Sequence, residues 1–379
     1  MRAGAPSPRR SAWSLTSAMA VPRAPSLFQV AARPEWLALH DEPPLLPDLP
    51  VVDAHHHLWV REHERYLLDD YQADLEDGHR IVATVYVQCG TGYRTEGPRV
   101  FAPVGETQFA SAIAARSREA RLRTHVCAGI VGYADLRLDR VEEVLQAHIA
   151  TDPGRFRGIR QAAAWDIDAR LVNPHMGTVQ GLYRDPAFRR GFARLAPLGL
   201  SFDAWALHPQ LPEVLSLARA FPETTLIVNH IGAPVGAGRF AGRRTEVRQA
   251  WLKDMRALAA CPNVYMKLGG LGLPILGFGF GQGPKPLDSG DLAGRMRPWV
   301  EPCIEAFGAA RCMFESNFPV DRVSYRYKVC WNAFKRLTDG CTESDRASLL
   351  HDTAWRIYGL RESDSSACAV VGQPYRPMQ

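Results

Sequence analysis

The chain has 379 residues, of which 46% are hydrophobic and 22% are charged, an ordinary composition for a globular protein of one or two domains. Its net charge of +5 comes from five arginines in residues 1–34, which contain no acidic residue; the rest of the chain has 40 basic and 40 acidic residues. This neutral body excludes the basic surface of a nucleic-acid-binding protein, and no run approaches the ~20 apolar residues of a membrane span.

Residues 48–362 are predicted to fold as one domain, between a flexible amino-terminal extension, residues 1–47, and a flexible tail, residues 363–379. The Arg- and Ser-rich start fits an organelle transit peptide, a disordered extension, or an upstream start with Met19 as the true first residue. The eight cysteines show no C-x-x-C spacing, which is typical of free thiols in a reducing compartment. We therefore expect a cytoplasmic protein; its oligomeric state stays open, a homo-oligomer included.

The first predicted strand, residues 51–57, reads Val-Val-Asp-Ala-His-His-His. Because successive side chains of a strand point to opposite faces, Asp53, His55 and His57 are predicted to share one face, and His56 the other. Two imidazoles two residues apart at a strand end can both reach one metal ion or one carbonyl oxygen. The motif therefore predicts a site at this strand end.

Seven further strand-like runs follow, most of them separated by helical patterns. These runs are residues 81–89, 125–133, 158–162, 200–206, 224–231, 263–269 and 312–318. The clearest helical patterns between them are residues 140–150, 212–220, 246–260 and 299–307. Eight β–α units in series predict a single-domain (β/α)8 TIM barrel. An open nucleotide-binding sheet would need a glycine-rich turn after its first strand, where Leu58 and Trp59 stand.

Two loops of this barrel are predicted to be long: residues 90–110 after the second strand and residues 269–294 after the seventh. The second loop is rich in glycine and in large apolar residues. We expect it to be mobile and to close over a substrate, or else to be a disordered insertion.

Active sites of such barrels lie at the carboxyl ends of the strands, so polar residues there are candidate site residues. Nearly every predicted strand of this chain ends in one. The candidates are His55, His57, Gln88, Arg160, Asp203, His208, His230, Lys267, Glu315 and Asn317.

Six segments carry a family resemblance in their order and spacing. They are residues 52–59 (VDAHHHLW), 156–161 (FRGIRQ), 202–203 (FD), 229–232 (NHIG), 263–268 (NVYMKL) and 313–319 (MFESNFP). Together they resemble the amidohydrolase superfamily, in particular its amidohydrolase-related branch. That branch includes 2-pyrone-4,6-dicarboxylate lactonase, fuconolactonase-like enzymes and some metal-dependent decarboxylases.

The resemblance implies roles for the histidines. His55 and His57 are expected to bind a divalent metal or to polarise a carbonyl directly, and His230 to contact the reacting carbonyl or its water. His208 is the candidate for a further metal ligand, although strand alternation from Asp203 places it on the opposite face. One zinc ion held by these four histidines and a metal-free site both stay open.

The eighth strand departs from the family pattern, because Asn317 stands where an aspartate usually takes the proton of the attacking water. An amide is a poor base, so a carboxylate elsewhere is expected to take this proton. We rank Asp321 first, then Glu106, then Glu315. Glu315 has a second interpretation, a buried ion pair with Lys267.

Four residues are predicted to bind the substrate: Gln88, Glu106, Arg160 and Lys267. Arg160 is expected to hold a substrate carboxylate; its alternative is a salt bridge to Asp203 or Glu106. We therefore expect a hydrolase that opens a small, carboxylated lactone, with a small anionic organic molecule as its partner. The alternatives are a metal-dependent decarboxylase of an aromatic or muconate-type acid and a catalytically inactive barrel used for binding.

Overall fold

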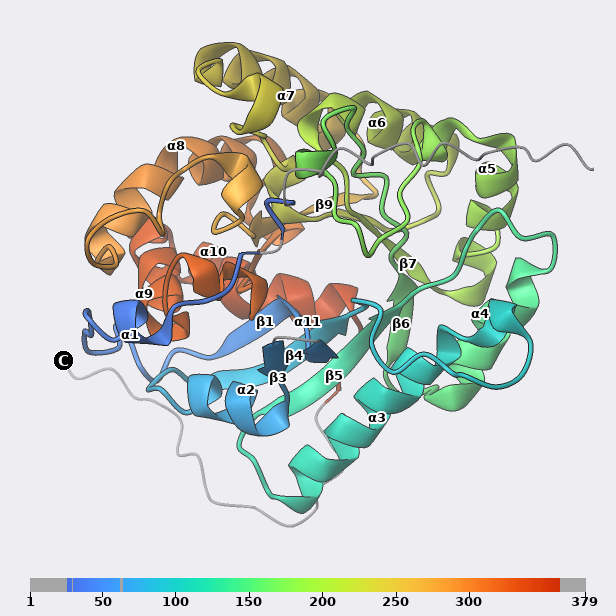
Figure 1. Ribbon diagram of the computed structural model, residues 1–379, viewed down its shortest axis with the longest axis horizontal. Coiled ribbons are helices and arrows are strands. Elements are labelled where there is room, and N and C mark those ends of the chain that lie inside the picture. Colours follow the sequence, from blue (N-terminus) through green and yellow to red (C-terminus); the bar gives the residue numbers. More distant parts are fainter. Residues whose placement is uncertain (1–25, 29, 62–63, 362–379) are drawn as a thin grey trace, which may run out of the picture.

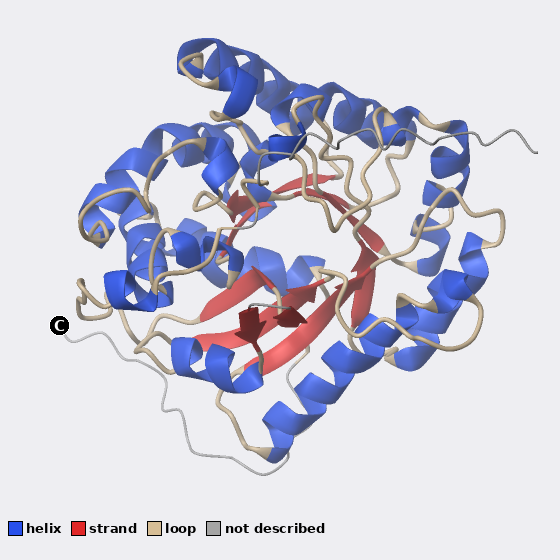
Figure 2. Ribbon diagram, viewed as in Figure 1, coloured by secondary structure: helices blue, strands red, loops and turns tan. Residues whose placement is uncertain are grey.

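The computed structural model of the protein describes residues 26–28, 30–61 and 64–361. Eight parallel strands form one sheet in the order β1-β4-β5-β6-β7-β8-β9-β10. Backbone hydrogen bonds from His57 N to Phe318 O (2.8 Å) and from Asn317 N to His55 O (2.9 Å) join β1 to the segment after β10. These bonds close the sheet into a ring of strands with helices outside it (Figures 1 and 2). The predicted (β/α)8 barrel is confirmed.

All eight predicted strands are present, each of them shorter than predicted. They are β1 Val51–His56, β4 Ile81–Val87, β5 His125–Gly132, β6 Phe156–Ile159, β7 Ser201–Ala204, β8 Leu226–Val228, β9 Val264–Gly269 and β10 Cys312–Glu315. A short hairpin that the sequence did not reveal, β2 Trp59–Arg61 and β3 Glu64–Tyr66, follows β1.

The helices include the four predicted ones. They are α1 Pro34–Leu37, α2 Leu68–Leu75, α3 Val104–Glu119, α4 Val141–Thr151, α5 Pro186–Phe192, α6 Leu211–Ala220, α7 Arg244–Ala259, α8 Ser289–Phe307, α9 Tyr327–Leu337, α10 Glu343–Ala347 and α11 Thr353–Ile357. Within the described ranges, no helix combines the length and apolar character needed to cross a membrane.

Both long loops are shorter than predicted, because α3 already begins at Val104 and α8 at Ser289. The loop after β9 also differs in character from the expected mobile lid. Its apolar side chains, such as Ile275 and Leu276, are fully buried in the core. Packing of this kind holds the loop against the barrel, and we find no open flap there among the described residues.

The hydrophobic core has two parts. A smaller cluster comes from alternate residues of the strands, such as Val52, Ala54 and Val85, and is closed by Tyr358 and Leu360 after α11. A larger cluster lies between the strands and the surrounding helices. Alternation between the two parts fixes which strand side chains face the barrel interior.

The described part of the predicted 1–47 extension packs against the barrel. Trp36 and Leu37 are buried, and Trp36 Nε1 donates a hydrogen bond to the carbonyl of Gly283 (2.9 Å). Leu45 N donates to Oδ1 of Asn332 in α9 (2.6 Å). The rest of the predicted extension, residues 1–25 and 29, and the predicted tail, residues 363–379, lie outside the described residues.

Candidate active site

Strand β1 places its histidines through an irregularity in its pairing. Asp53 pairs with Thr84 of β4, whereas His56 pairs with Tyr86, so three steps of β1 match two steps of β4. This extra residue reverses the alternation between Asp53 and His55. The prediction that Asp53 shares a face with His55 is therefore wrong.

Asp53 instead faces the helices. Its Oδ2 accepts hydrogen bonds from Tyr71 of α2 (2.9 Å), from Ser316 (2.6 Å) and from Tyr327 of α9 (3.0 Å). His56 also lies on this outer side, stacked on Tyr71 with ring centroids 4.4 Å apart, as predicted. Asp53 therefore anchors the strand that carries the site, without entering the site.

Glu315 at the end of β10 joins two of the predicted site histidines. Its Oε1 lies 2.6 Å from Nδ1 of His230, and it also accepts a hydrogen bond from the backbone N–H of that residue (2.9 Å). Its Oε2 lies 2.8 Å from Nδ1 of His55 but makes no hydrogen bond. The carboxylate is fully buried, so its charge acts on the two imidazoles with little screening.

A sharp turn after β8 brings His230 to this carboxylate. His230 and Ile231 both have positive φ, 52° and 47°, which is uncommon for residues other than glycine. Gly270 lies directly against the His230 ring, and a Cβ atom at that position would overlap the ring. Glycine at position 270 is therefore required by the close approach of the imidazole.

Each ring nitrogen of His55 faces a hydrogen-bond acceptor, but a neutral imidazole has only one proton to donate. His57 Nδ1 lies 2.7 Å from the carbonyl of Val87, so Nδ1 carries the proton and Nε2 is left as an acceptor. His57 Nε2 lies 3.1 Å from Nε2 of His55. With its proton on Nδ1, His55 turns a lone pair toward His57; with its proton on Nε2, it turns one toward Glu315. Either arrangement suits a cation or a shared proton.

Burial keeps the imidazoles of His55 and His57 neutral. It lowers the pKa of His55 and of His57 well below the usual 6.5, and the neighbouring cations Lys267 and Arg160 lower it further. Both histidines are therefore uncharged at neutral pH, the form in which an imidazole binds metal or accepts a proton.

His55, His230 and Glu315 could hold one divalent cation. Their ligand atoms all lie within 4.8 Å of one another, and no other group of this kind occurs among the residues that the structure describes. Imidazole and carboxylate are ligands that suit zinc and similar ions. His57 is not part of this group, and neither is His208.

His208, the predicted further ligand, has other partners. It follows β7, its Nδ1 accepts a hydrogen bond from Val235 N (3.2 Å), and its ring packs on Phe240. Burial lowers its pKa to about 4. His208 therefore belongs to the packing around the site.

Arg160 lies beside His55 at the end of β6. Its Nη1 lies 3.3 Å from Nε2 of His55, and its Nη2 donates to the carbonyl of Gln88. Arg160 is only 3% exposed, its Nε makes no hydrogen bond, and no described carboxylate forms an ion pair with it. Gln88 is held in return, by a bond from its Nε2 to the Arg160 carbonyl (3.4 Å). The alternative interpretation of Arg160, a salt bridge to Asp203 or Glu106, is not found in the structure.

Lys267 is deeper in the barrel and has its own partner. Its Nζ lies 2.7 Å from Oδ1 of Asp203, 3.4 Å from Nδ1 of His55 and 4.0 Å from Oε2 of Glu315. Asp203 also accepts hydrogen bonds from Asn229 (2.8 Å) and Tyr358 (3.1 Å). The predicted Lys267–Glu315 pair is thus secondary to Lys267–Asp203, and the Lys267 side chain is fully buried.

Two of the carboxylates ranked as proton acceptors are engaged elsewhere. Glu106 lies in the first turn of α3, and its Oε1 accepts hydrogen bonds from Tyr86 (2.9 Å) and from the backbone of Cys89 (2.7 Å). Asp321 is fully buried and accepts hydrogen bonds from Asn317 Nδ2 (2.8 Å) and Gly272 N (2.9 Å). Each carboxylate shapes a loop, and neither lines the pocket.

A pocket at the carboxyl ends of the strands opens above these residues. His57, Arg160, His230 and Asn317 line it, and His55 lies beneath them, fully buried. The structure therefore brings together most of the residues predicted from the strand ends.

Sequence reasoning missed most of the walls of this pocket, although Leu273, from the loop after β9 that was expected to close over a substrate, lines it. The missed residues include Trp59, Trp205 and Arg61, and also Phe28 and Val30, which belong to the predicted amino-terminal extension. The Trp59 indole lies under the Arg61 guanidinium, 3.7 Å from the ring centroid. Trp59 stands two residues after His57, and its place beside the histidine motif was a signal in the sequence.

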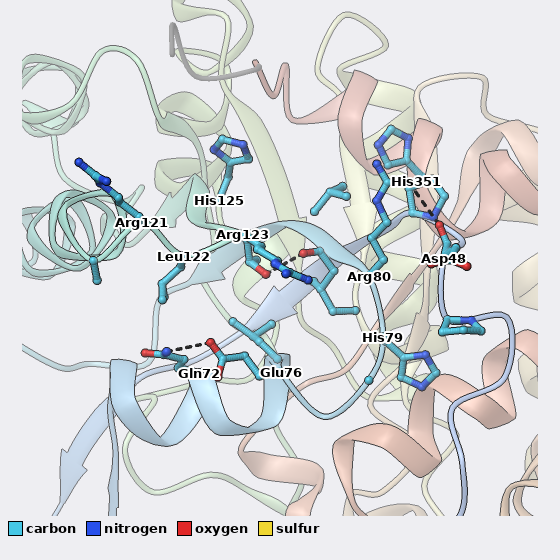
Figure 3. Close-up of a pocket in the computed structure, with 18 of the residues that line it drawn as sticks. Asp48, Gln72, Glu76, His79, Arg80, Arg121, Leu122, Arg123, His125 and His351 are labelled. Carbon is cyan, nitrogen blue, oxygen red and sulfur yellow. Dashed lines mark hydrogen bonds between the residues drawn. The ribbon is translucent and has the colours of Figure 1, made fainter. Parts of the chain in front are cut away.

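A larger cavity lies at the opposite end of the barrel, around the start of β4 and the segment before β5 (Figure 3). It is lined by Arg80, Arg121 and Arg123, which are exposed, and Arg121 extends away from the other two (Figure 3). Exposed arginines that diverge do not form a convergent binding group. The predicted site residues His57, Arg160, His230 and Asn317 line the smaller pocket instead.

Comparison with known proteins gives consistent matches. The family model described as Amidohydrolase matches residues 52–360. The chain is 33% identical over 336 residues to the uncharacterized protein y4mH of Sinorhizobium fredii, which covers 83% of this chain and 99% of that protein. It is 28% identical over 282 residues to an L-fucono-1,5-lactonase of Burkholderia ambifaria, covering 72% and 81% of the two chains.

Solved structures show the same fold. An amidohydrolase from Burkholderia multivorans, crystallised with bound zinc, superposes with a TM-score of 0.63 at 24% identity, over 82% of this chain and 99% of that one.

Proposed function

We propose that this chain, which belongs to the amidohydrolase family, hydrolyses a small, carboxylated lactone. Family membership and the lactonase names of its relatives make it an enzyme of the hydrolase class. The observation that carries the choice of substrate is Arg160, a buried guanidinium without a carboxylate partner among the described residues. A buried cation without a counter-ion is costly, and a substrate carboxylate would remove that cost.

The proton chemistry is assigned to His230 and Glu315. Because Glu315 accepts from Nδ1 of His230, Nε2 of this imidazole is left as the proton acceptor. We assign it the proton of a water that attacks the lactone carbonyl, while the negative charge of Glu315 stabilises the imidazolium. The same proton then goes to the ring oxygen as the ester bond breaks, which gives the hydroxy acid.

This assignment replaces the carboxylates ranked from the sequence. Asp321 and Glu106 are bonded within loops, and Glu315 acts through the imidazole. Asn317 lines the pocket beside His230 and is proposed to orient the water.

A cation would fit the same residues. His55, His230 and Glu315 would hold it, and we propose zinc, since two imidazoles and one carboxylate are a ligand set that zinc accepts. Bound there, the ion would act as a Lewis acid on the carbonyl and on water, and His230, engaged as a ligand, would not take the water's proton. Reaction on the side chains alone is the other outcome of metal analysis.

A hydrolysis panel tests the proposal. Carboxylated γ- and δ-lactones, their methyl esters and L-fucono-1,5-lactone would be followed by acid release, with Glu315→Gln as the control for background hydrolysis. We expect the free carboxylates to be preferred over their methyl esters. Release of carbon dioxide from aromatic acids, without lactone hydrolysis, would favour the decarboxylase alternative.

A further inference from the structure

The side chain of Asn317 is held by a carboxylate that the proposed reaction does not use. Asn317 Nδ2 donates to Oδ1 of Asp321 (2.8 Å), and Asp321 N donates to the carbonyl of Asn317 (3.2 Å). Two more donors, the hydroxyl of Tyr325 and the backbone N–H of Gly272, point at Oδ2 of the same carboxylate. Among the described residues, every group that hydrogen-bonds to a side-chain oxygen of Asp321 is therefore a donor.

The chemistry of this contact determines how the amide lies. In its ionised form, the Asp321 carboxylate only accepts hydrogen bonds, so in that form the NH2 group of Asn317 has to face it, as the Nδ2–Oδ1 contact shows. The amide oxygen Oδ1 then lies on the other side, and no described residue donates to it. Because Asn317 lines the pocket, this oxygen is the part of the amide available to a bound molecule.

We propose that Asp321 is a positioning residue, which fixes the Asn317 amide so that its oxygen, and not its NH2 group, is presented to the pocket. Asn317 then accepts a hydrogen bond from the attacking water and leaves that water's lone pair free for the carbonyl. The effect on catalysis rests on the proposed function; the orientation of the amide does not.

The same contact explains why position 317 carries an amide. An aspartate there would place a second carboxylate about 2.8 Å from Asp321, and two carboxylates at that distance do not both ionise. The backbone at this position has a φ of 56°, which asparagine tolerates better than most residues. Asn317 and Asp321 therefore form a matched pair.

A double-mutant cycle tests the proposal. Asp321→Asn should lower kcat/KM about 10- to 100-fold in the wild-type background, as for other supporting residues. In the Asn317→Ala background it should have no further effect. Ser324→Ala, which removes a 2.7 Å hydrogen bond to the carbonyl of Gly272 in the same loop, is the matched control and should leave kcat/KM unchanged. Equal losses in both backgrounds would overturn the proposal.

A second measurement does not depend on activity. With selective ¹⁵N-asparagine labelling, the side-chain NH2 signal of Asn317, assigned from its loss in Asn317→Ala, should be protected from exchange in the wild type. It should lose that protection in Asp321→Asn and keep it in Ser324→Ala. An unchanged signal in Asp321→Asn would contradict the assigned orientation, whereas absent lactonase activity with the expected signals would contradict only the proposed function. If Asp321→Asn does not fold, Tyr325→Phe, which removes one donor to Asp321, should give a smaller change in the same direction.

Discussion

Glu315 lies 2.6 Å from Nδ1 of His230, and this contact decides which nitrogen of the imidazole faces the pocket. Glu315→Gln keeps the shape of the side chain and removes its charge. Because the charge stabilises the imidazolium, we expect kcat to fall by about 10²- to 10⁴-fold, the usual loss for general acid–base catalysis. Steady-state kinetics, with circular dichroism to check folding, measures this. Unchanged kcat in a folded variant would remove the pair from the proton chemistry.

Arg160→Met tests the binding of the substrate carboxylate. Loss of one partner of a buried charge pair should lower kcat/KM for an anionic lactone by the equivalent of about 2–4 kcal/mol. The same variant should lose little on the methyl ester of that lactone, which has no charge to bind. Arg61→Met, at the pocket wall, is the control and should discriminate less between acid and ester. Equal losses on acid and ester would take Arg160 out of carboxylate binding.

His55 and His56 are neighbours in sequence, but His55 faces the barrel interior and His56 the surrounding helices, so substitutions at the two positions form a matched pair. His55→Gln should lose bound zinc and most of the activity, because His55 belongs to the cation group. His56→Gln should keep both, since His56 stacks on Tyr71 outside the barrel, but should lose about 1–3 kcal/mol of unfolding free energy for its disturbed hydrogen bond to Thr84.

Metal analysis of both proteins, before and after treatment with a chelator, measures this difference. Zinc in neither protein, together with full activity of the chelator-treated wild type, would establish reaction on the side chains alone.

The stability of the protein should depend on pH through Asp321. Burial raises the pKa of Asp321 from its usual 3.8 to about 7. The folded state therefore binds this proton more tightly than the unfolded state, so the contribution of Asp321 to the unfolding free energy falls as the pH rises from about 4 to about 7 and is constant above that. The Asp321→Asn variant has no ionisable group at this position, so its unfolding free energy lacks this pH-dependent contribution.

Urea unfolding of both proteins at about pH 5 and about pH 8 measures this contribution of Asp321 to the unfolding free energy. The wild type should lose more stability than the variant between the two pH values. Parallel losses would show that Asp321 is ionised throughout.

Local sequence patterns predicted the barrel because each strand and several helices carry their own apolar period. The outward position of His56 was predicted in the same way. Asp53 was misplaced because the irregular pairing with β4 depends on the partner strand, which alternation within one strand does not reveal.

The role of Glu315 was likewise beyond a local pattern. It depends on the turn at His230, whose positive φ brings the ring to a residue 85 positions away along the chain. Asp321 was ranked as the proton acceptor because its place after β10 was visible in the sequence, whereas its complete burial was not.

The most direct test of the account is the rate of ring opening of one carboxylated lactone by the wild type, Glu315→Gln and Arg160→Met, measured beside its methyl ester. We predict efficient hydrolysis of the acid by the wild type, loss of kcat in Glu315→Gln on both compounds, and loss of kcat/KM in Arg160→Met on the acid alone. Hydrolysis that is equal for acid and ester and indifferent to both substitutions would contradict the account.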